Sequence, residues 1–330
     1  MRWGILGPGR IARAFLTGLA GSATETAVAV GSRDLGRARV VADDFGVPRA
    51  YGSYEELLAD AEVDAVYVVL PNSLHAEWSK AAARVGKHVL CEKPLGRAAA
   101  EVEAMFETAR AHGVWLMEAF MYRFHPRTLA LAELVARGDI GEVRLLRSSF
   151  GFTVTDTANV RLSAELAGGA LMDVGCYAVN AARMLAGRPS RVSAVARWTP
   201  DGVDETLAGM LEHGGPVSQV SCSLASSHHD LIQVVGTDGV VDVPRAFTPL
   251  PDRPAGLVVT QGARGGEPTE IGFEPVNQYT AEAEGFARLV AAGHEDATGL
   301  PQVPLAESLD NAATIEALLL SARESRPVDL

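Results

Sequence analysis

The sequence predicts an α/β protein of two domains, the first built on a parallel sheet and the second on a large, mostly antiparallel open sheet. Its 330 residues, of which 48% are hydrophobic and 21% are charged, exceed what a single hydrophobic core usually covers. Short apolar runs alternate with helical stretches over the first third of the chain, and this pattern changes near residue 123. We therefore place the domains at residues 1–121 and 122–330.

Strands and helices are expected to alternate in the first domain. Apolar runs predict strands at residues 3–6, 27–30, 65–70, 88–91 and 114–117. Helical periodicity predicts helices between them at residues 11–19, 37–45, 54–59 and 98–111. This repeat is typical of a parallel sheet that is covered by helices on both faces.

The second domain has the pattern of an α+β fold. Helices are predicted at residues 127–137 and about 305–323, and alternation predicts strands at residues 143–150 and 217–223. The tetrapeptide GTDG at residues 236–239 indicates a turn between two strands. Residues 249–266 are rich in Pro and Gly, so we expect a loop and a sheet edge there.

Composition excludes several classes of protein. The net charge of −12 argues against a nucleic-acid partner, because binding to phosphates needs a basic surface. No apolar run approaches the length of a membrane span. A strand pattern begins at residue 2, so we expect no secretory signal and a cytoplasmic protein. Neither disulfides nor a metal site are expected, because the cysteines lie far apart: Cys91, Cys176 and Cys222.

The first chemical motif is GPGRIA at residues 7–12, between a predicted strand and a predicted helix. Gly7 permits a tight turn, Gly9 lets the backbone approach a pyrophosphate, and Ala12 is small enough for close packing. The helix N-terminus at Arg10 and Ile11 supplies N–H donors for an anion. We interpret the motif as a dinucleotide site; the alternative is a tight turn without a ligand.

The end of the second strand indicates which dinucleotide binds. An NAD site usually has an acidic residue there, whereas this chain has Ser32 and Arg33, followed one helical turn later by Arg37. A hydroxyl group and guanidinium groups suit a 2′-phosphate, which predicts NADP. Asp34 keeps NAD open as the alternative, because its carboxylate could accept the ribose hydroxyls; the arginines would then be solvated.

Two further strands end in LPNSLH at residues 70–75 and CEKP at residues 91–94. Ligands bind at the carboxyl ends of strands in open α/β sheets, so these residues are expected beside the cofactor. Lys93 is one of only three lysines in the chain. A lysine differs from an arginine in that its charge can tune a neighbour or be given up when the side chain is desolvated.

Five stretches, GPGRIA, LPNSLH, CEKPLG, MEAFMYRFHP and GGALMDVGCY, resemble the Gfo/Idh/MocA family of oxidoreductases over essentially the whole chain. The sequence is most similar to the branch of D-xylose dehydrogenases and trans-dihydrodiol dehydrogenases. The resemblance implies that Lys93 is the active-site lysine, that Pro94 follows a cis bond and that Glu92 lies near the cofactor. The predicted cofactor contacts are Gly7, Gly9, Arg10, Ile11, Ser32, Arg33, Arg37, Leu70, Pro71, Asn72, His75, Glu92 and Lys93.

The resemblance also assigns the acid/base residues. Many members have Asp-x-Gly-x-His-x-x-Asp, where this chain has Asp173, Gly175, Tyr177 and Asn180. Tyrosine holds the acid/base position in some branches, so Tyr177 is expected to keep that role together with Asp173. Asn180 cannot exchange a proton, which puts a second carboxylate in doubt. The family further implies a homodimer or homotetramer through the open sheet.

The chemistry is consistent with this assignment. Oxidation of an alcohol needs a hydride acceptor and a base for the hydroxyl proton. A phenol with an unperturbed pKa near ~10 is a weak base near neutrality, but a nearby cation lowers such a pKa by about 1 to 3 units. Lys93 would supply that cation to Tyr177, with Asp173 holding one of the two in place. The alternative is that Tyr177 is a core residue whose hydroxyl is satisfied.

The sequence thus predicts an NADP-dependent oxidoreductase acting on a sugar or a cyclic diol or polyol. The alternatives are a ketoreductase of a modified or nucleotide-linked sugar and a non-catalytic, NADP-binding regulator. Arg123, Arg161 and Asn180 are candidate substrate contacts, while interdomain salt bridges are the other reading for the two arginines.

Overall fold

The computed structural model describes residues 1–262, 264–293 and 301–330 and divides the chain into two compact units. Unit 1 comprises Met1–Phe124 and Asn277–Ser308, and unit 2 comprises His125–Val276 and Leu309–Leu330. The first crossing between units lies close to the predicted boundary at 121/122. The return of residues 277–308 to unit 1 differs from the two continuous domains that the sequence suggested. No helix in the described part of the chain is long and apolar enough to cross a membrane.

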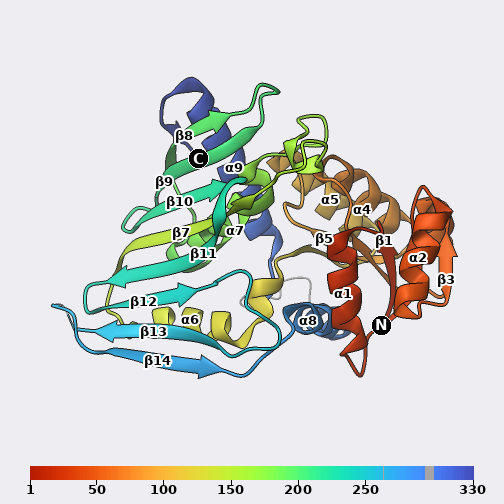
Figure 1. Ribbon diagram of the computed structural model, residues 1–330, viewed down its shortest axis with the longest axis horizontal. Coiled ribbons are helices and arrows are strands. Elements are labelled where there is room, and N and C mark those ends of the chain that lie inside the picture. Colours follow the sequence, from red (N-terminus) through yellow and green to blue (C-terminus); the bar gives the residue numbers. More distant parts are fainter. Residues whose placement is uncertain (263, 294–300) are drawn as a thin grey trace. The chain divides into compact units, whose positions relative to one another are not determined.

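Unit 1 contains a six-stranded sheet in the order β3-β2-β1-β4-β5-β6, and all of its strand pairs are parallel (Figure 1). The strands are β1 (Arg2–Leu6), β2 (Thr26–Gly31), β3 (Arg49–Tyr51), β4 (Ala65–Val68), β5 (His88–Glu92) and β6 (Leu116–Ala119). The predicted parallel sheet is confirmed. The edge strand β3 was missed, because three residues are too few to set up a recognisable pattern.

The helices of unit 1 are α1 (Arg10–Ala20), α2 (Leu35–Phe45), α3 (Tyr54–Leu58), α4 (His75–Arg84), α5 (Ala99–Ala111) and α8 (Gln278–Ala292). Local sequence fixes several of their ends. Ser53 caps α3 by accepting from the N–H of Glu56, and α2 ends at Gly46, which has the left-handed φ of +64°. The sequence reading did not identify α4 or α8.

Packing explains why α8 belongs to unit 1. Phe286 and Ala283 are fully buried in one core cluster with Trp3 and Phe15. The Trp3 and Phe286 ring centroids are 5.6 Å apart. Gly18 of α1 allows the close approach of α8, since a Cβ there would lie 2.7 Å from the Cβ of Tyr279. The strand β1 therefore buries its side chains against a helix that is distant in sequence.

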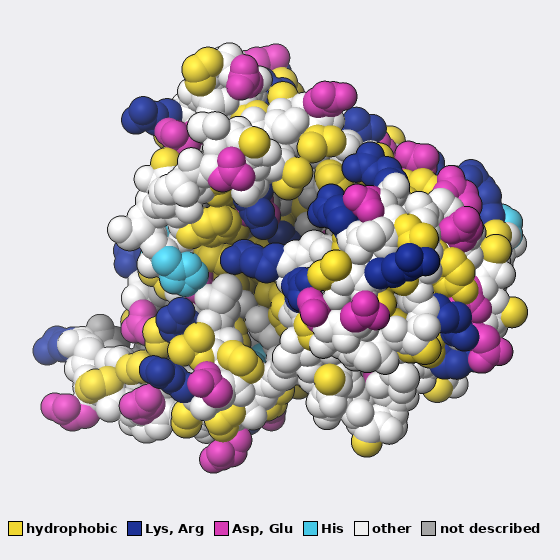
Figure 2. Space-filling model, turned by 45° about the vertical axis from the view of Figure 1, so that its right-hand side comes forward, with side chains coloured by type: hydrophobic (Ala, Val, Ile, Leu, Met, Phe, Trp, Pro, Cys, Tyr) yellow, Lys and Arg dark blue, Asp and Glu magenta, His cyan; other side chains and the backbone are white. Residues whose placement is uncertain are grey.

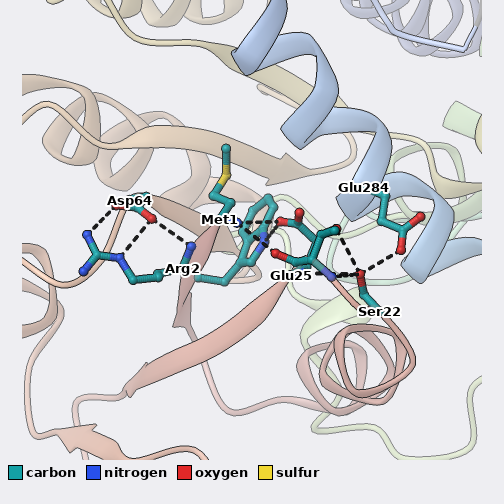
Figure 3. Close-up of polar contacts among 8 residues, drawn as sticks. Met1, Arg2, Ser22, Glu25, Asp64 and Glu284 are labelled. Atoms are coloured by element: carbon teal, nitrogen blue, oxygen red, sulfur yellow. Dashed lines mark hydrogen bonds and ion pairs between the residues drawn. The ribbon is translucent and has the colours of Figure 1, made fainter.

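Polar contacts near the N-terminus stabilise the same part of unit 1, around β1, α1 and α8 (Figure 3). The Met1 amine donates to the carbonyl oxygen of Thr24 at 3.1 Å and lies 3.5 Å from a carboxylate oxygen of buried Glu25. Trp3 Nε1 donates to Glu25 at 2.8 Å. Ser22 donates to Glu284 of α8 at 2.7 Å, so the end of α1 and α8 are joined by a hydrogen bond as well as by packing.

Unit 2 contains a nine-stranded sheet in the order β14-β13-β12-β11-β7-β10-β9-β8-β15 (Figure 1). The strands are β7 (Val143–Thr153), β8 (Arg191–Trp198), β9 (Asp204–Glu212), β10 (Val217–Ser223), β11 (Ala225–Gly236), β12 (Gly239–Pro244), β13 (Ala255–Gln261), β14 (Pro268–Phe273) and β15 (Val328–Asp329). Among the described strands of this sheet, β7 and β10 alone pair in parallel, so the mostly antiparallel sheet is confirmed.

Two local predictions in unit 2 had different outcomes. The turn at residues 236–239 joins β11 and β12, as expected. The loop expected within residues 249–266 is present at residues 249–254, but the expected sheet edge is corrected, because β13 follows there and is one strand in from the edge strand β14. Its apolar core, Leu257 and Val259, is buried despite the surrounding Pro and Gly.

Helices cover one face of this sheet: α6 (Pro126–Arg137), α7 (Cys176–Ala186) and α9 (Leu305–Glu324), whose first turn counts with unit 1 (Figure 1). Leu146, Ser148 and Phe150 of β7 alternate toward the covered face and are buried. The other face carries exposed apolar side chains, including Val195 and Met210. Alternation of this kind is typical of an antiparallel sheet with one covered face.

Surface charges pair locally. Arg13 and Asp44 of unit 1 lie 2.7 Å apart, and Arg137 and Glu133 of unit 2 lie 3.0 Å apart. On the face visible in Figure 2, basic and acidic side chains are interspersed among apolar ones. Such exposed pairs contribute little to stability, because solvent and salt screen their charges.

Candidate active site

The structure divides the predicted site residues between the units. Unit 1 carries every predicted cofactor contact, including Lys93, and also Arg123. Unit 2 carries Arg161, Asp173, Tyr177 and Asn180.

The turn after β1 is built around glycine. Gly7 has φ +111°, and a Cβ on it would lie 2.7 Å from the carbonyl oxygen of Val69. Its N–H donates to the carbonyl oxygen of Gly31 at 3.1 Å. At Gly9 a Cβ would meet nothing within 4 Å, so the backbone there faces open space. This turn, which leads into the N-terminus of α1, has the accessible backbone that a pyrophosphate requires.

The end of β2 carries the residues predicted to select the cofactor. Asp34 caps α2, since its Oδ1 accepts from the N–H of Arg37 at 3.2 Å. Ser32 is buried, and its Oγ accepts from the N–H of Asp34 at 3.2 Å. Burial raises the pKa of Tyr54, and nearby Arg33 and Arg37 both oppose this rise. The guanidinium groups of Arg33 and Arg37 therefore both lie near Tyr54. Oδ1 of Asp34 is occupied by its hydrogen bond at the N-terminus of α2.

His75 joins the two other strand-end motifs. Its side chain is fully buried, with Nε2 at 2.9 Å from the carbonyl oxygen of Leu70 and Nδ1 at 2.9 Å from that of Pro94. Burial lowers the pKa of His75. Pro71 and Asn72 begin the short 3₁₀ turn that leads into α4. The imidazole thus fixes the LPN turn to the CEKP turn, and a cofactor contact by His75 stays a prediction.

Glu92 and Lys93 follow directly at the end of β5. Glu92 is 7% exposed, accepts a short hydrogen bond from the hydroxyl of Tyr67 and accepts from the N–H of Lys93 at 3.3 Å. The Lys93–Pro94 peptide bond is cis, which confirms the expectation from the family resemblance. The backbone before and after Lys93 is therefore held by a buried carboxylate and by the His75 contact to Pro94.

The sequence reading missed a buried carboxyl group in unit 1. Glu282 of α8 is fully buried, and neither of its carboxylate oxygens has a hydrogen-bond partner among the residues that the structure describes. Burial, and then the charge of Glu92, raise the pKa of Glu282 well above its usual range. Burial likewise raises the pKa of Tyr67 and of Tyr279. Because α8 was not recognised in the sequence, no local signal connected this carboxyl to the strand ends.

In unit 2, GGALMDVGCY forms a π-helical turn (Leu171–Gly175) that continues into α7. Asp204 of β9 accepts from the N–H of Leu171 at 2.7 Å. Gly169 has φ +128°, and a Cβ on it would lie 2.1 Å from Asp204 Oδ1. Burial raises the pKa of Asp204 to about 6. This missed residue therefore anchors the start of the segment that carries Asp173 and Tyr177.

Asp173 is paired with Arg161. Arg161 Nε donates to Asp173 Oδ2 at 2.5 Å, and the guanidinium lies 5.7 Å from the ring centroid of Phe152. Asn159 holds the backbone of Arg161 through a 3.1 Å hydrogen bond. The salt bridge expected as one alternative for Arg161 is present, but it lies within unit 2. Its role in substrate binding stays a prediction.

Tyr177 lies in the first turn of α7 and is 5% exposed. Its ring centroid is 5.6 Å from that of Phe150 and 5.3 Å from that of Phe247. Asn180, three residues on, is fully buried on the same helix. The phenol ring is thus enclosed by aromatic side chains of the sheet and of the turn after β12.

Arg123 is 1% exposed and lies within unit 1. Its guanidinium donates to Glu307 at 2.6 Å and to the carbonyl oxygens of Pro301 at 3.1 Å and Gln302 at 2.7 Å. The interdomain salt bridge expected as an alternative is thus an ion pair inside one unit. Substrate binding by Arg123 stays a prediction.

Comparison with known families assigns the chain. Residues 1–120 match the model of the Gfo/Idh/MocA oxidoreductase family with an NAD-binding Rossmann fold, and residues 128–242 match the Gfo/Idh/MocA C-terminal domain. A D-xylose 1-dehydrogenase (NADP(+)) from Haloferax volcanii is 44% identical over the full length of both chains. The chain belongs to the Gfo/Idh/MocA oxidoreductase family. This confirms the resemblance read from the five motifs.

Two further proteins are similar to this chain over most of its length. The mouse trans-1,2-dihydrobenzene-1,2-diol dehydrogenase is 37% identical and covers 93% of this chain and 92% of its own. A 3-ketoreductase from Actinomadura kijaniata, solved with NADP and TDP-benzene, is 31% identical, with a TM-score of 0.89 and 97% of each chain covered.

Among the described residues no group of three or more His, Cys, Asp or Glu side chains could hold a metal ion.

Proposed function

We propose that the protein is an NADP-dependent oxidoreductase that transfers a hydride between the nicotinamide and a CH–OH or C=O group of a sugar or cyclic polyol. The observation that carries this proposal is the full-length similarity to an NADP-dependent D-xylose dehydrogenase. The family resemblance read from the sequence assigns the site to Lys93, Asp173 and Tyr177. The open backbone at Gly9 fits a dinucleotide phosphate.

In the proposed mechanism Tyr177 exchanges a proton with the substrate oxygen. Oxidation takes the hydroxyl proton onto the phenolate, and reduction returns it to the carbonyl oxygen. The ammonium group of Lys93 stabilises the phenolate and hydrogen-bonds the same substrate oxygen. Asp173, oriented by its 2.5 Å contact with Arg161, fixes the polar groups around the reacting oxygen. NADP supplies the hydride chemistry itself.

The preference for NADP rests on the end of β2. Arg33 and Arg37 are the cationic residues available to a 2′-phosphate, and Ser32 supplies a hydroxyl. Asp34 is the residue that kept NAD open as the alternative. Its Oδ1 caps the N-terminus of α2 by accepting from the N–H of Arg37. Two of the relatives described above, the archaeal dehydrogenase and the ketoreductase, are named or solved with NADP.

A second candidate is a ketoreductase of a nucleotide-linked sugar. It is favoured by the 0.89 TM-score to a 3-ketoreductase that was solved with NADP and TDP-benzene. A non-catalytic regulator is less well supported, because Lys93, Asp173 and Tyr177 are all present. A cytoplasmic location is also part of the proposal.

A homodimer or homotetramer through the open sheet face is also part of the proposal. Val195 on that face is 72% exposed, and Leu231 and Met210 are 39% and 36% exposed. A groove of about 770 Å³ lies on the same face. Exposed apolar patches of this kind commonly mark interaction surfaces.

The deciding experiment monitors NADPH formation or consumption with aldoses, ketosugars, nucleotide-linked ketosugars and trans-diols. Turnover of an aldose or a diol supports the first candidate, and turnover of only nucleotide-linked ketosugars supports the second. If no substrate reacts while titration demonstrates NADPH binding, the regulator replaces both.

A further inference from the structure

A buried arginine of unit 2 holds the turn that follows β12. Arg127 is 1% exposed, and its guanidinium donates to three successive carbonyl oxygens, those of Pro244 at 3.0 Å, Arg245 at 2.7 Å and Ala246 at 3.0 Å. Burial lowers the pKa of Arg127 to about 10, with Asp230 opposing the shift. A cation that is costly to bury is therefore used to fix the carbonyl groups of one short turn.

A buried acid holds the same turn by its donor groups. The side chain of Asp230 is fully buried. It accepts from the N–H of Phe247 at 2.9 Å and accepts a short hydrogen bond from the hydroxyl of Thr248. His228 Nε2 lies 3.3 Å from the second carboxylate oxygen. Arg127 thus binds carbonyl groups of residues 244–248, and Asp230 binds an N–H and an O–H group of the same residues.

The conformation of this turn would not persist by local preference. Arg245 has φ +48°, in the left-handed region that residues with a side chain rarely adopt. Backbone of this kind is maintained only where the surroundings determine it. Replacing buried charges with apolar groups often stabilises a protein, so the two charges are better explained by the geometry they impose than by stability.

The turn at residues 244–248 places the ring of Phe247 beside Tyr177, the candidate acid/base residue. Phe247 is fully buried, its ring stacks on Phe150 with centroids 5.7 Å apart, and its centroid is 5.3 Å from that of Tyr177. Phe150 in turn lies edge-on to Tyr177 at 5.6 Å. The two phenylalanine rings limit the orientations that the Tyr177 ring can adopt.

We propose that Arg127 and Asp230 are positioning residues for Tyr177, which act by locking the turn at residues 244–248 so that Phe247 orients the phenol. Neither residue contacts the reacting atoms; both act through Phe247. The inference rests on the proposed function for its effect on turnover, but its effect on the orientation of Tyr177 can be measured without any substrate.

The direct test uses fluorine NMR on protein labelled with 3-fluorotyrosine. The chain has six tyrosines, and Tyr177 is the one in unit 2, so the other five signals are internal controls. Tyr177→Phe assigns the signal. Arg127→Met and Asp230→Asn are each expected to shift or broaden the Tyr177 resonance and to leave the other five unchanged.

The second arm measures kinetics on the full-length variants. Arg127→Met and Asp230→Asn should lower kcat by about 10- to 100-fold, the usual scale for a misplaced reacting group, with the affinity for NADPH unchanged. Arg127→Lys, which keeps one donor group in place of a guanidinium fork, should recover part of the loss. Leu211→Ala is the control, since Leu211 is a fully buried residue of β9 outside this turn. It should lower the melting temperature and leave kcat and the Tyr177 signal as they are.

The outcomes separate the two proposals. An unchanged Tyr177 resonance in both folded variants overturns the positioning role, whatever the activity. If Arg127→Met fails to fold, Arg127→Lys and Asp230→Asn decide the question by the same readouts. A Tyr177→Phe enzyme that turns over like the parent refutes the proposed catalytic role of Tyr177 instead, and the NMR arm still tests the positioning.

Discussion

The proposed site residues of unit 1 differ from those of unit 2 in how the chain positions them. Unit 1 presents backbone and exposed cations at the ends of parallel strands, as at Gly9 and Arg33, where local sequence determines the geometry. Unit 2 presents buried side chains, such as Tyr177, whose surroundings come from distant parts of the chain. The difference predicts that substitutions at the end of β2 in unit 1 change cofactor affinity, whereas substitutions around Tyr177 in unit 2 change turnover or stability.

The largest effect is expected where the proposed chemistry draws on both units. Lys93→Met and Tyr177→Phe should each lower kcat by at least about two orders of magnitude, the scale of a positioned acid/base group, while NADPH still binds. Because the two residues are proposed to act as one unit, the double variant should be little worse than either single variant. Fully additive losses in stopped-flow or steady-state kinetics would contradict this coupling.

A smaller effect is expected at the cofactor end of unit 1. Arg33→Ala removes a charge-assisted contact worth roughly 1.5 to 3 kcal/mol, which corresponds to about a 10- to 150-fold loss of NADPH affinity. NADH affinity should hardly change, and Ser32→Asp added to Arg33→Ala should invert the preference. Arg13→Ala in α1, which breaks an exposed pair with Asp44, is the matched control.

Fluorescence titration of both cofactors measures these affinities. A parent protein that prefers NADH would contradict the assignment of Ser32 and Arg33. So would a loss of binding in Asp34→Ala that Arg33→Ala does not produce, because Asp34 would then be the ribose contact.

In unit 2, the buried carboxyl group of Asp204 is expected to change the free energy of unfolding by about 1 to 3 kcal/mol between acidic and neutral pH. Burial raises the pKa of Asp204 from 3.8 to about 6, so the folded state holds this proton more tightly than the unfolded state. Its contribution to stability is therefore full below about pH 4 and is lost as the pH rises through 6. Asp204→Asn does not ionise, so its stability relative to the parent should increase between pH 4 and pH 6.

Urea unfolding at intervals from pH 4 to pH 8 measures this difference. Asp44→Asn, at an exposed site of unit 1, is the control and should show no comparable rise. A stability difference between Asp204→Asn and the parent that is independent of pH would mean that Asp204 does not carry its proton in the folded state.

The smallest effect is expected at the N-terminus of unit 1 (Figure 3). Glu25→Gln removes the ion pair with the Met1 amine and weakens the 2.8 Å hydrogen bond from Trp3, and should cost about 1 kcal/mol of unfolding free energy. Glu62→Gln breaks an exposed pair with Arg2 and should cost less than about 0.5 kcal/mol. Equal costs in urea unfolding would show that burial of Glu25 does not matter.

Much of unit 1 could be predicted because its signals are local. The run 88–91 is apolar because β5 is buried on both faces, and the glycine motif at residues 7–12 specifies its own turn. The motif GGALMDVGCY pointed to Asp173 and Tyr177, but their partners Asp204 and Phe247 lie on other elements. A buried acid at the start of a strand looks like any surface acid in the sequence.

The sequence by itself determined the two kinds of sheet, the glycine turn and the family, since each depends on residues that are neighbours in the chain. Only the tertiary structure decided that α8 completes unit 1, that Glu282 is buried there, and that Arg127 and Asp230 meet at the turn carrying Phe247. The physical reason is that the cost of burying a charge, and the contacts that offset it, are set by groups brought together from distant parts of the chain.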